Sequence, residues 1–90
     1  MSVLMIAEVP NMTEEIYGAM VPQLAPQLQK APGFVSHAGG PSPSGGWRVV
    51  EIWDSEAQSE AWFENSVKPN LPPDVVPDRT FHPVHTAFTA

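Results

Sequence analysis

The chain has 90 residues, a length that fits one domain and leaves no room for a second. Its composition, 42% apolar and 16% charged, is typical of a globular protein. Ten acidic against four singly scattered basic residues give a net charge of −6, which argues against nucleic acid as a partner because phosphate binding needs clustered Lys and Arg. The absence of cysteine excludes disulfides, Zn–Cys sites and thiol nucleophiles.

Residues Val3–Val9 form a short apolar run that is closed by a proline–asparagine pair. The run is too short for a helix, so it predicts a strand. The next residues, Asn11–Glu14, fit a helix capping box, and apolar positions then recur every four residues as far as Leu28. This spacing places the apolar side chains on one face of a helix.

Two prolines interrupt the predicted helix. Pro22 and Pro26 each remove a backbone donor and crowd the carbonyl four residues earlier, at about 3 kcal/mol or more inside a helix. We therefore expect a kink or a break near Val21, with a second piece starting at one of the two prolines. The sequence KAPG at residues 30–33 ends the helix.

The middle of the chain predicts a β-hairpin. Residues 34–38 predict a strand, and the glycine- and proline-rich segment 39–46 predicts a connecting loop without the helix that a phosphate-binding loop requires. Residues Trp47–Trp53 are the clearest strand of the sequence, with valine and isoleucine inside it.

The last third of the chain predicts a second helix and a final strand. A capping box begins at Ser55, apolar side chains give residues 57–67 a buried side, and residues 68–73 end this helix. Residues Arg79–Phe88 predict the final strand, in which Pro83 indicates an edge position or a bulge. The order β-α-β-β-α-β predicts an α+β, ferredoxin-like sandwich, a four-stranded antiparallel sheet with both helices on one face.

The sheet face that the helices leave open predicts a homodimer. Alternate residues of Trp47–Trp53 point to opposite faces, and both sets include large apolar side chains. Because the helices cover one face only, the other needs a cover, and for so short a chain that cover is a second copy. A tryptophan buried in such an interface would remove on the order of 200 Å² from water.

Nothing in the sequence predicts a membrane partner. No apolar run approaches the ~18–20 residues of a membrane span. The first eight residues also lack the basic stretch and the long apolar region of a secretory signal. We therefore expect a cytoplasmic protein.

Three stretches resemble the antibiotic biosynthesis monooxygenase (ABM) superfamily: GFVSH at residues 33–37, GWRVVEIWDS at residues 46–55, and Ala57 on the following helix. The resemblance covers essentially the whole chain, with a closing strand at residues 81–85. It implies a dimeric α/β barrel with a pocket between sheet and helices in each subunit. The family includes monooxygenases that convert aromatic polyketides to quinones without metal or flavin, haem-degrading enzymes, isomerases and cyclases.

The family's motifs match this chain in part. The quinone-forming enzymes have a pocket tryptophan, an asparagine four residues before it, and a tyrosine about a helical turn and a half after it. Trp53 matches the tryptophan, whereas Val49 stands at the asparagine position and Ser59 near the tyrosine position. In the haem-degrading branch the iron-binding histidine falls roughly at Phe63, and phenylalanine cannot ligate iron, so haem degradation is not expected.

Glu51 and His37 are the candidate catalytic residues. Glu51 shares a strand face with Trp53, and a carboxylate among apolar rings favours its neutral form, which suits an acid or base near neutral pH. The hairpin can bring His37 near Glu51, and a His–carboxylate pair would be a proton shuttle. Both residues also fit a purely structural role, hydrogen-bonded to their neighbours.

We expect a cavity beside the indole of Trp53 that is large enough for a ring compound. No metal is expected, because the chain has no cysteine and because His82 and His85, three residues apart, face opposite sides of a regular strand. No other cofactor is expected either. The predicted substrate-binding residues are Trp53, Val49, Phe63, Ser59, Trp47 and His85.

Two classes of function remain open. The first is a small cofactor-independent enzyme acting on an aromatic or polyketide-like compound, either as a monooxygenase in which the deprotonated substrate reduces O₂, or as a cyclase or isomerase. The second is a non-catalytic dimeric barrel that binds a small hydrophobic molecule or serves a stress-related role. The residues Val49 and Ser59 favour the second class, whereas Glu51 and His37 favour the enzyme, which is our working hypothesis.

Overall fold

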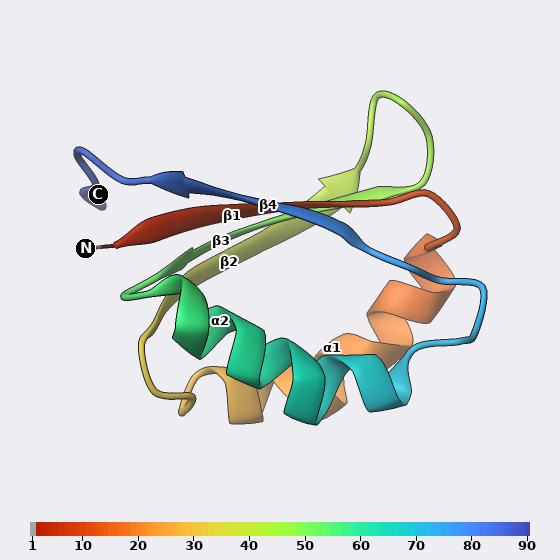
Figure 1. Ribbon diagram of the computed structural model, residues 1–90. Coiled ribbons are helices and arrows are strands. Elements are labelled where there is room, and N and C mark those ends of the chain that lie inside the picture. Colours follow the sequence, from red (N-terminus) through yellow and green to blue (C-terminus); the bar gives the residue numbers. More distant parts are fainter. Residues whose placement is uncertain (1) are drawn as a thin grey trace.

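The computed structural model describes residues 2–90 of the chain. Four strands form one antiparallel sheet in the order β2-β3-β1-β4, and both helices lie on the same face of it (Figure 1). This is the predicted α+β, ferredoxin-like sandwich. The elements are β1 (Val3–Val9), α1 (Glu14–Leu28), β2 (Phe34–Pro41), β3 (Trp47–Trp53), α2 (Glu56–Trp62), a π-helical segment (Phe63–Val67), a 3₁₀ turn (Lys68–Asn70) and β4 (Asp78–Pro83).

The register of the sheet decides which side chains face the helices. In the central pair of strands, Glu51 of β3 lies opposite Met5 of β1, and Val49 lies opposite Ala7. Residues paired in this way share a face of the sheet. The helix-facing side therefore carries the buried residues of these two strands, which are Met5, Ala7, Val9, Trp47, Glu51 and Trp53.

The opposite face of the sheet points away from both helices (Figure 1). Its centre holds four half-buried apolar side chains, Leu4, Ile6, Val50 and Ile52. The two tryptophans of β3 are not among them, because Trp47 and Trp53 are buried on the helix side. The expectation that tryptophan would fill a subunit interface is therefore wrong, although an apolar face does remain open.

Helix α1 is continuous, so of the kink or break predicted near Val21 the break does not occur. Pro22 and Pro26 both lie on the exposed side, where the carbonyls that lose their partners can be hydrated. The opposite side of the helix faces the sheet (Figure 1), and Leu28 on this helix is buried. Helix α1 has 15 residues and α2 has seven. Within residues 2–90, no helix is both long and apolar enough to cross a membrane.

The two helices begin at side-chain caps. The Oγ1 atom of Thr13 accepts a hydrogen bond from the amide of Ile16, so Thr13 rather than the predicted Asn11 caps α1. The side chain of Asn11 instead donates to the carbonyl of Asp74 and ties the start of α1 to the loop before β4. Ser55 caps α2, as the sequence predicts.

The edge strands differ in length from the prediction. β2 extends to Pro41 because the hairpin remains paired with β3 through Gly39 and Gly40. β4 ends at Pro83 rather than at Phe88, because the ladder with β1 ends at the Val3–Pro83 pair and is followed only by a single hydrogen bond from the Val84 amide to the Ser2 carbonyl. Pro83 thus occupies the end of an edge strand, one of the two positions that the sequence allowed.

Candidate functional site

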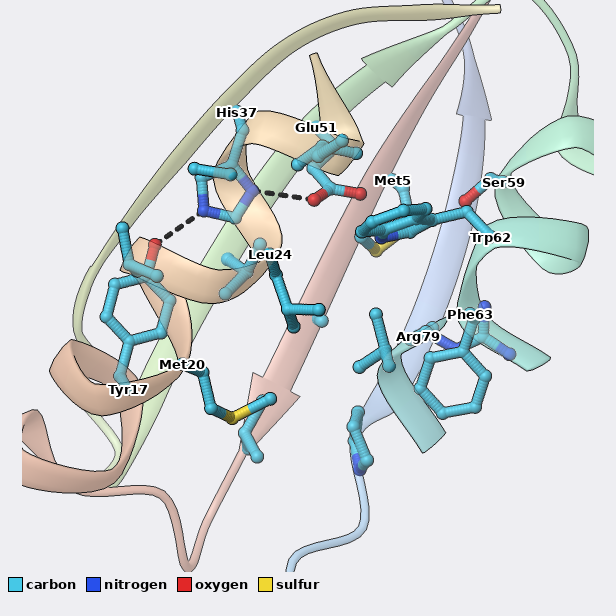
Figure 2. A pocket seen from close by; sticks show the side chains of 18 of the residues that line it. Met5, Tyr17, Met20, Leu24, His37, Glu51, Ser59, Trp62, Phe63 and Arg79 are labelled. Carbon is cyan, nitrogen blue, oxygen red and sulfur yellow. Dashed lines mark hydrogen bonds and ion pairs between the residues drawn. The ribbon is translucent and has the colours of Figure 1, made fainter. Parts of the chain in front are cut away.

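A cavity of about 520 Å³ lies between the sheet and the helices (Figure 2). A space of this size accommodates a small organic molecule. Most of its wall is aliphatic, aromatic or thioether surface from β1, α1 and the segments around α2. The side chains with strong hydrogen-bonding groups are few, and include Tyr17, His37, Glu51, Ser59 and Arg79.

Glu51 is the most buried charged group of the cavity wall, with 5% of the residue exposed. Its Oε2 atom lies 2.6 Å from Nδ1 of His37, and its Oε1 atom accepts a hydrogen bond from the indole of Trp53 at 2.9 Å. Because a carboxylate has only acceptors, both of its partners must donate. The carboxylate is therefore held between two N–H groups, one from each of two neighbouring strands.

His37 connects Glu51 to helix α1. It lies directly opposite Glu51 in the pairing of β2 with β3. Its second ring nitrogen, Nε2, lies 2.5 Å from the phenol oxygen of Tyr17. With Nδ1–H donated to Glu51, Nε2 is the acceptor and the Tyr17 hydroxyl donates to it. A continuous hydrogen-bonded chain thus runs from Tyr17 through the imidazole to the carboxylate (Figure 2).

Burial raises the pKa of the Tyr17 phenol, and the negative charge of Glu51 acts in the same direction. The phenol therefore keeps its proton throughout the neutral range. A hydrogen bond from a protonated phenol to the imidazole is consistent with this state.

Five of the eight predicted site residues line the cavity, namely Glu51, His37, Val49, Phe63 and Ser59. Glu51, His37 and Val49 come from the hairpin, whereas Ser59 and Phe63 come from α2 and the π-helical segment that follows it. The alternation of the strands and the spacing of one helical turn between Ser59 and Phe63 bring them to one space. Their roles in binding or catalysis remain predictions.

Trp53 lies outside the cavity lining. Its side chain is completely buried, and the ring of Phe34 packs edge-on against it with centroids 5.5 Å apart. Its contact with the site is the hydrogen bond to Glu51. The cavity is thus lined by Glu51 and His37 rather than by the indole beside which we expected it.

Trp47 and His85 also lie outside the lining. Trp47 packs against Tyr17 with ring centroids 5.1 Å apart, near one end of the hydrogen-bonded chain. His85 follows the end of β4, is exposed, and has its Nδ1 atom 2.6 Å from the hydroxyl of Thr86.

The sequence prediction lacks most of the cavity residues, among them Tyr17, Trp62 and Arg79. Arg79 places its guanidinium 3.8 Å above the centre of the Phe63 ring and forms an ion pair with Glu60 at 2.9 Å. These contacts depend on how α2 and β4 pack together, which local sequence does not reveal. Figure 2 shows Arg79 and Trp62 on the side of the cavity opposite Tyr17.

One local signal could have pointed to Tyr17. Gly39 lies two residues after His37 on the same side of β2, and a Cβ atom there would come within 2.5 Å of the phenol oxygen. A glycine at this position indicates that another group approaches the strand closely. The closest such group is the Tyr17 side chain.

The histidines offer little for a metal. Of the three histidines, only His37 lines the cavity, and both of its nitrogens are hydrogen-bonded. His82 lies on β4, with its Nε2 atom 3.1 Å from the hydroxyl of Thr80. Within residues 2–90, no three His, Cys, Asp or Glu side chains are grouped so that they could hold a metal ion.

No protein-family model and no curated protein matches the chain by sequence. SnoaB, a cofactor-independent oxygenase from Streptomyces nogalater, matches it in structure with a TM-score of 0.62 and 9% identity, over 99% of this chain and 96% of SnoaB. A mutant of MhuD with two manganese protoporphyrin IX molecules bound per active site gives a TM-score of 0.67 and 18% identity over 100% of both chains. The protein YjcS gives 0.65 and 18%, over 93% of this chain and 99% of its own.

SnoaB and MhuD have the ABM fold, so the resemblance expected from the sequence is confirmed at the level of the fold. Identities of 9% and 18% carry the comparison no further than that. One of these neighbours is an oxygenase without cofactor and the other binds a porphyrin. The chemistry of this chain must therefore be argued from its own side chains.

Proposed function

We propose that this protein is a cofactor-independent enzyme that removes a proton from an aromatic or polyketide-like substrate held in the cavity. The observation that carries the proposal is the pair formed by His37 and Glu51, 2.6 Å apart in the wall of an apolar space. The side chain of Glu51 is 7% exposed and that of His37 is 26% exposed. A proton that arrives on the imidazole forms an ion pair with the carboxylate, so the charge created in this apolar site is not left unpaired.

The lining favours a flat, largely apolar substrate. Aromatic rings bury large areas against such walls, and the flexible thioethers of Met5, Met12 and Met20 adapt to their shape. A His–carboxylate pair suits groups that lose a proton near neutral pH, such as a phenol, an enol or a C–H between carbonyls and aromatic rings. Anthrone-like compounds have both a flat aromatic ring system and a proton of this kind.

In the oxygenase form, the substrate itself supplies the electrons. The carbanion left after proton removal gives one electron to O₂, and the resulting radical and superoxide combine into a peroxide. The peroxide takes back the proton that the site removed, and loss of water then leaves a carbonyl group. Overall a CH₂ group and O₂ become C=O and H₂O, which needs neither a metal nor a reductant. The shared fold with SnoaB, an oxygenase without cofactor, supports this form.

A cyclase or isomerase on the same site is the second candidate. Such an enzyme uses the same proton removal and returns the proton elsewhere on the substrate, without O₂. Val49 and Ser59 line the cavity where the quinone-forming enzymes resembled by this sequence have asparagine and tyrosine, which argues against quinone formation but leaves the proton transfer of His37 and Glu51 unaffected.

Haem degradation is not part of the proposal. An axial ligand requires a nitrogen or another donor that is free to bind iron. Phe63 and the Arg79 guanidinium stacked on it occupy one side of the cavity, and both nitrogens of His37 are already hydrogen-bonded.

An oxygen electrode with 1,8-dihydroxyanthrone tests the proposal. The wild type should consume one O₂ per substrate, above the rate of spontaneous oxidation, and His37→Gln and Glu51→Gln should lower kcat/KM by about 100-fold or more. Gln23→Ala, on the exposed side of α1, is the matched control and should behave as the wild type. Turnover without O₂ uptake identifies a cyclase or isomerase, and tight binding without turnover would contradict an enzyme.

We also propose that the protein is a homodimer in which the open sheet faces of two copies pack together. The four apolar side chains at the centre of this face, Leu4, Ile6, Val50 and Ile52, give the interface its hydrophobic centre. A contiguous apolar face of this kind is rarely left to solvent. Two identical faces can pair with closed, two-fold symmetry.

A further inference from the structure

The atoms of the His37–Glu51 pair are occupied inside the protein. Nδ1 of His37 is bonded to Oε2 of Glu51, Nε2 of His37 to the hydroxyl of Tyr17, and Oε1 of Glu51 to the indole N–H of Trp53. An imidazole has only two positions for hydrogen bonds, so His37 has no position left for a substrate. The carboxylate retains spare lone pairs, but its side chain is 7% exposed.

The phenol oxygen of Tyr17 is the end of this chain. Its proton is donated to His37, and its lone pairs remain free to accept from another donor. Tyr17 comes from α1 and lines the cavity, opposite the sheet that carries the other members (Figure 2). Among the hydrogen-bonded groups of Tyr17, His37 and Glu51, the phenol is therefore the one that can contact a substrate without first breaking an internal hydrogen bond.

The sheet is shaped to receive this phenol. A Cβ atom at Gly39 would lie 2.5 Å from the Tyr17 oxygen and 3.2 Å from Nε1 of Trp47, so both groups approach the same glycine. The indole N–H of Trp47 is buried and has no hydrogen-bond partner within residues 2–90. A buried donor without a partner is costly, and this one lies beside the glycine that the phenol also approaches.

We infer that Tyr17 is the catalytic residue that contacts the acidic group of the substrate, and that His37 and Glu51 are positioning residues that act through it. The inference rests on the proposed function and names its first proton acceptor. The substrate's O–H or C–H proton moves to the Tyr17 oxygen while the Tyr17 proton moves to Nε2 of His37. The products are a substrate anion, a neutral phenol and an imidazolium paired with Glu51, and the reverse path returns the proton. The raised pKa of Tyr17 agrees with a phenol that relays a proton rather than one that waits as a phenolate.

Because Tyr17 is the single tyrosine of the chain, growth on 3-fluorotyrosine places one fluorine reporter at this ring alone. Saturation of the labelled, full-length protein with 1,8-dihydroxyanthrone should shift its ¹⁹F resonance, since the probe contacts the phenol. A residue with a purely structural role would keep its resonance. An unmoved signal at saturation would overturn the inference.

Three variants connect this contact to turnover. Tyr17→Phe keeps the ring and removes the relay atom, and should lower kcat/KM by about 100-fold while the Kd of the probe changes less than threefold. Gly39→Ala keeps the tyrosine but displaces its hydroxyl, and should lose turnover in the same way. Gly40→Ala is the matched control, because a Cβ there meets nothing within 4 Å, and should leave turnover unchanged.

The outcomes separate this inference from the proposed function. Turnover that survives in Tyr17→Phe, with the wild type active, overturns the role of Tyr17 and leaves His37 as the direct base. A wild type without turnover refutes the proposed function and this inference together. Thermal unfolding of each variant shows whether a loss of activity reflects the site or the fold.

Discussion

Glu51 organises the site because it accepts hydrogen bonds from two different strands. His37 of β2 and Trp53 of β3 both donate to it, and it lies on the helix-facing side of the sheet. The sequence predicts the pair of His37 and Glu51, because strand alternation and the hairpin determine which residues face each other. It does not predict Tyr17, since the contact between α1 and β2 depends on how a helix packs across a sheet. Within β2, only Gly39 indicates that another group approaches the strand closely.

Replacement of this carboxylate by an amide tests both of its roles. Glu51→Gln can still accept from Trp53 but presents an N–H group towards the N–H of His37, so we expect a loss of about 1–3 kcal/mol in the free energy of unfolding. The fall in kcat/KM should be far larger than this loss of stability would explain. Urea denaturation and turnover assays measure the two effects, with the exposed Glu56→Gln as control. Wild-type turnover in Glu51→Gln would show that the carboxylate is structural only.

Tyr17 gives the fold a dependence on alkaline pH. Burial raises its pKa above the ordinary value of 10.0, so the folded state holds the phenol proton where the unfolded chain has begun to lose it. This contribution to stability is complete below pH 10 and is lost as the pH rises through the folded pKa. The free energy of unfolding should therefore fall more steeply above pH 10 in the wild type than in Tyr17→Phe. Parallel curves for the two proteins would contradict the assignment.

At the scale of the elements, hydrophobic periodicity was a better guide than proline. The order of strands and helices follows from patterns that repeat every two or every three to four residues. The break expected in α1 does not occur, because Pro22 and Pro26 lie on the exposed side while the buried side is held by the sheet. The last strand ends early for a reason outside its own sequence, since its ladder with β1 ends at the pair formed by Val3 and Pro83.

If the prolines of α1 are tolerated rather than favourable, their removal should stabilise the helix. Pro22→Ala restores an N–H for the carbonyl of Gly18 and relieves crowding, at the expense of a more flexible unfolded chain. We expect a net gain of about 1–2 kcal/mol in the free energy of unfolding, measured by chemical denaturation. Pro43→Ala in the exposed hairpin loop is the control and should not stabilise. A lower stability in Pro22→Ala would indicate that the proline sets a helix geometry that the site needs.

At the scale of the whole molecule, the two faces of the sheet have separate tasks. One face holds the core and the cavity, and the other presents half-buried aliphatic side chains away from the helices. The alternation of β3 predicts both faces from the sequence, although the assignment of tryptophan to the open face is wrong. Which face the helices choose is decided by packing across several elements, and the strand's own pattern is apolar on both sides.

A charge placed on the open face tests the proposed dimer. Ile52→Glu introduces a carboxylate at the centre of the proposed interface, where two copies would bury like charges against each other. Size-exclusion chromatography with light scattering should give twice 9.8 kDa for the wild type and 9.8 kDa for the variant. Ala57→Glu, on the exposed surface of α2, is the control and should remain dimeric. A monomeric wild type at micromolar concentration would contradict the proposed assembly.

On this account, the cavity ionises its ligand through the hydrogen-bonded chain of Tyr17, His37 and Glu51 in its wall. The most direct measurement is the absorption spectrum of bound 1,8-dihydroxyanthrone, recorded without oxygen at a pH where the free compound is neutral. We predict that the wild type converts the bound compound to its anion, and that Glu51→Gln binds it in the neutral form. A neutral spectrum in the saturated wild type would contradict the claim.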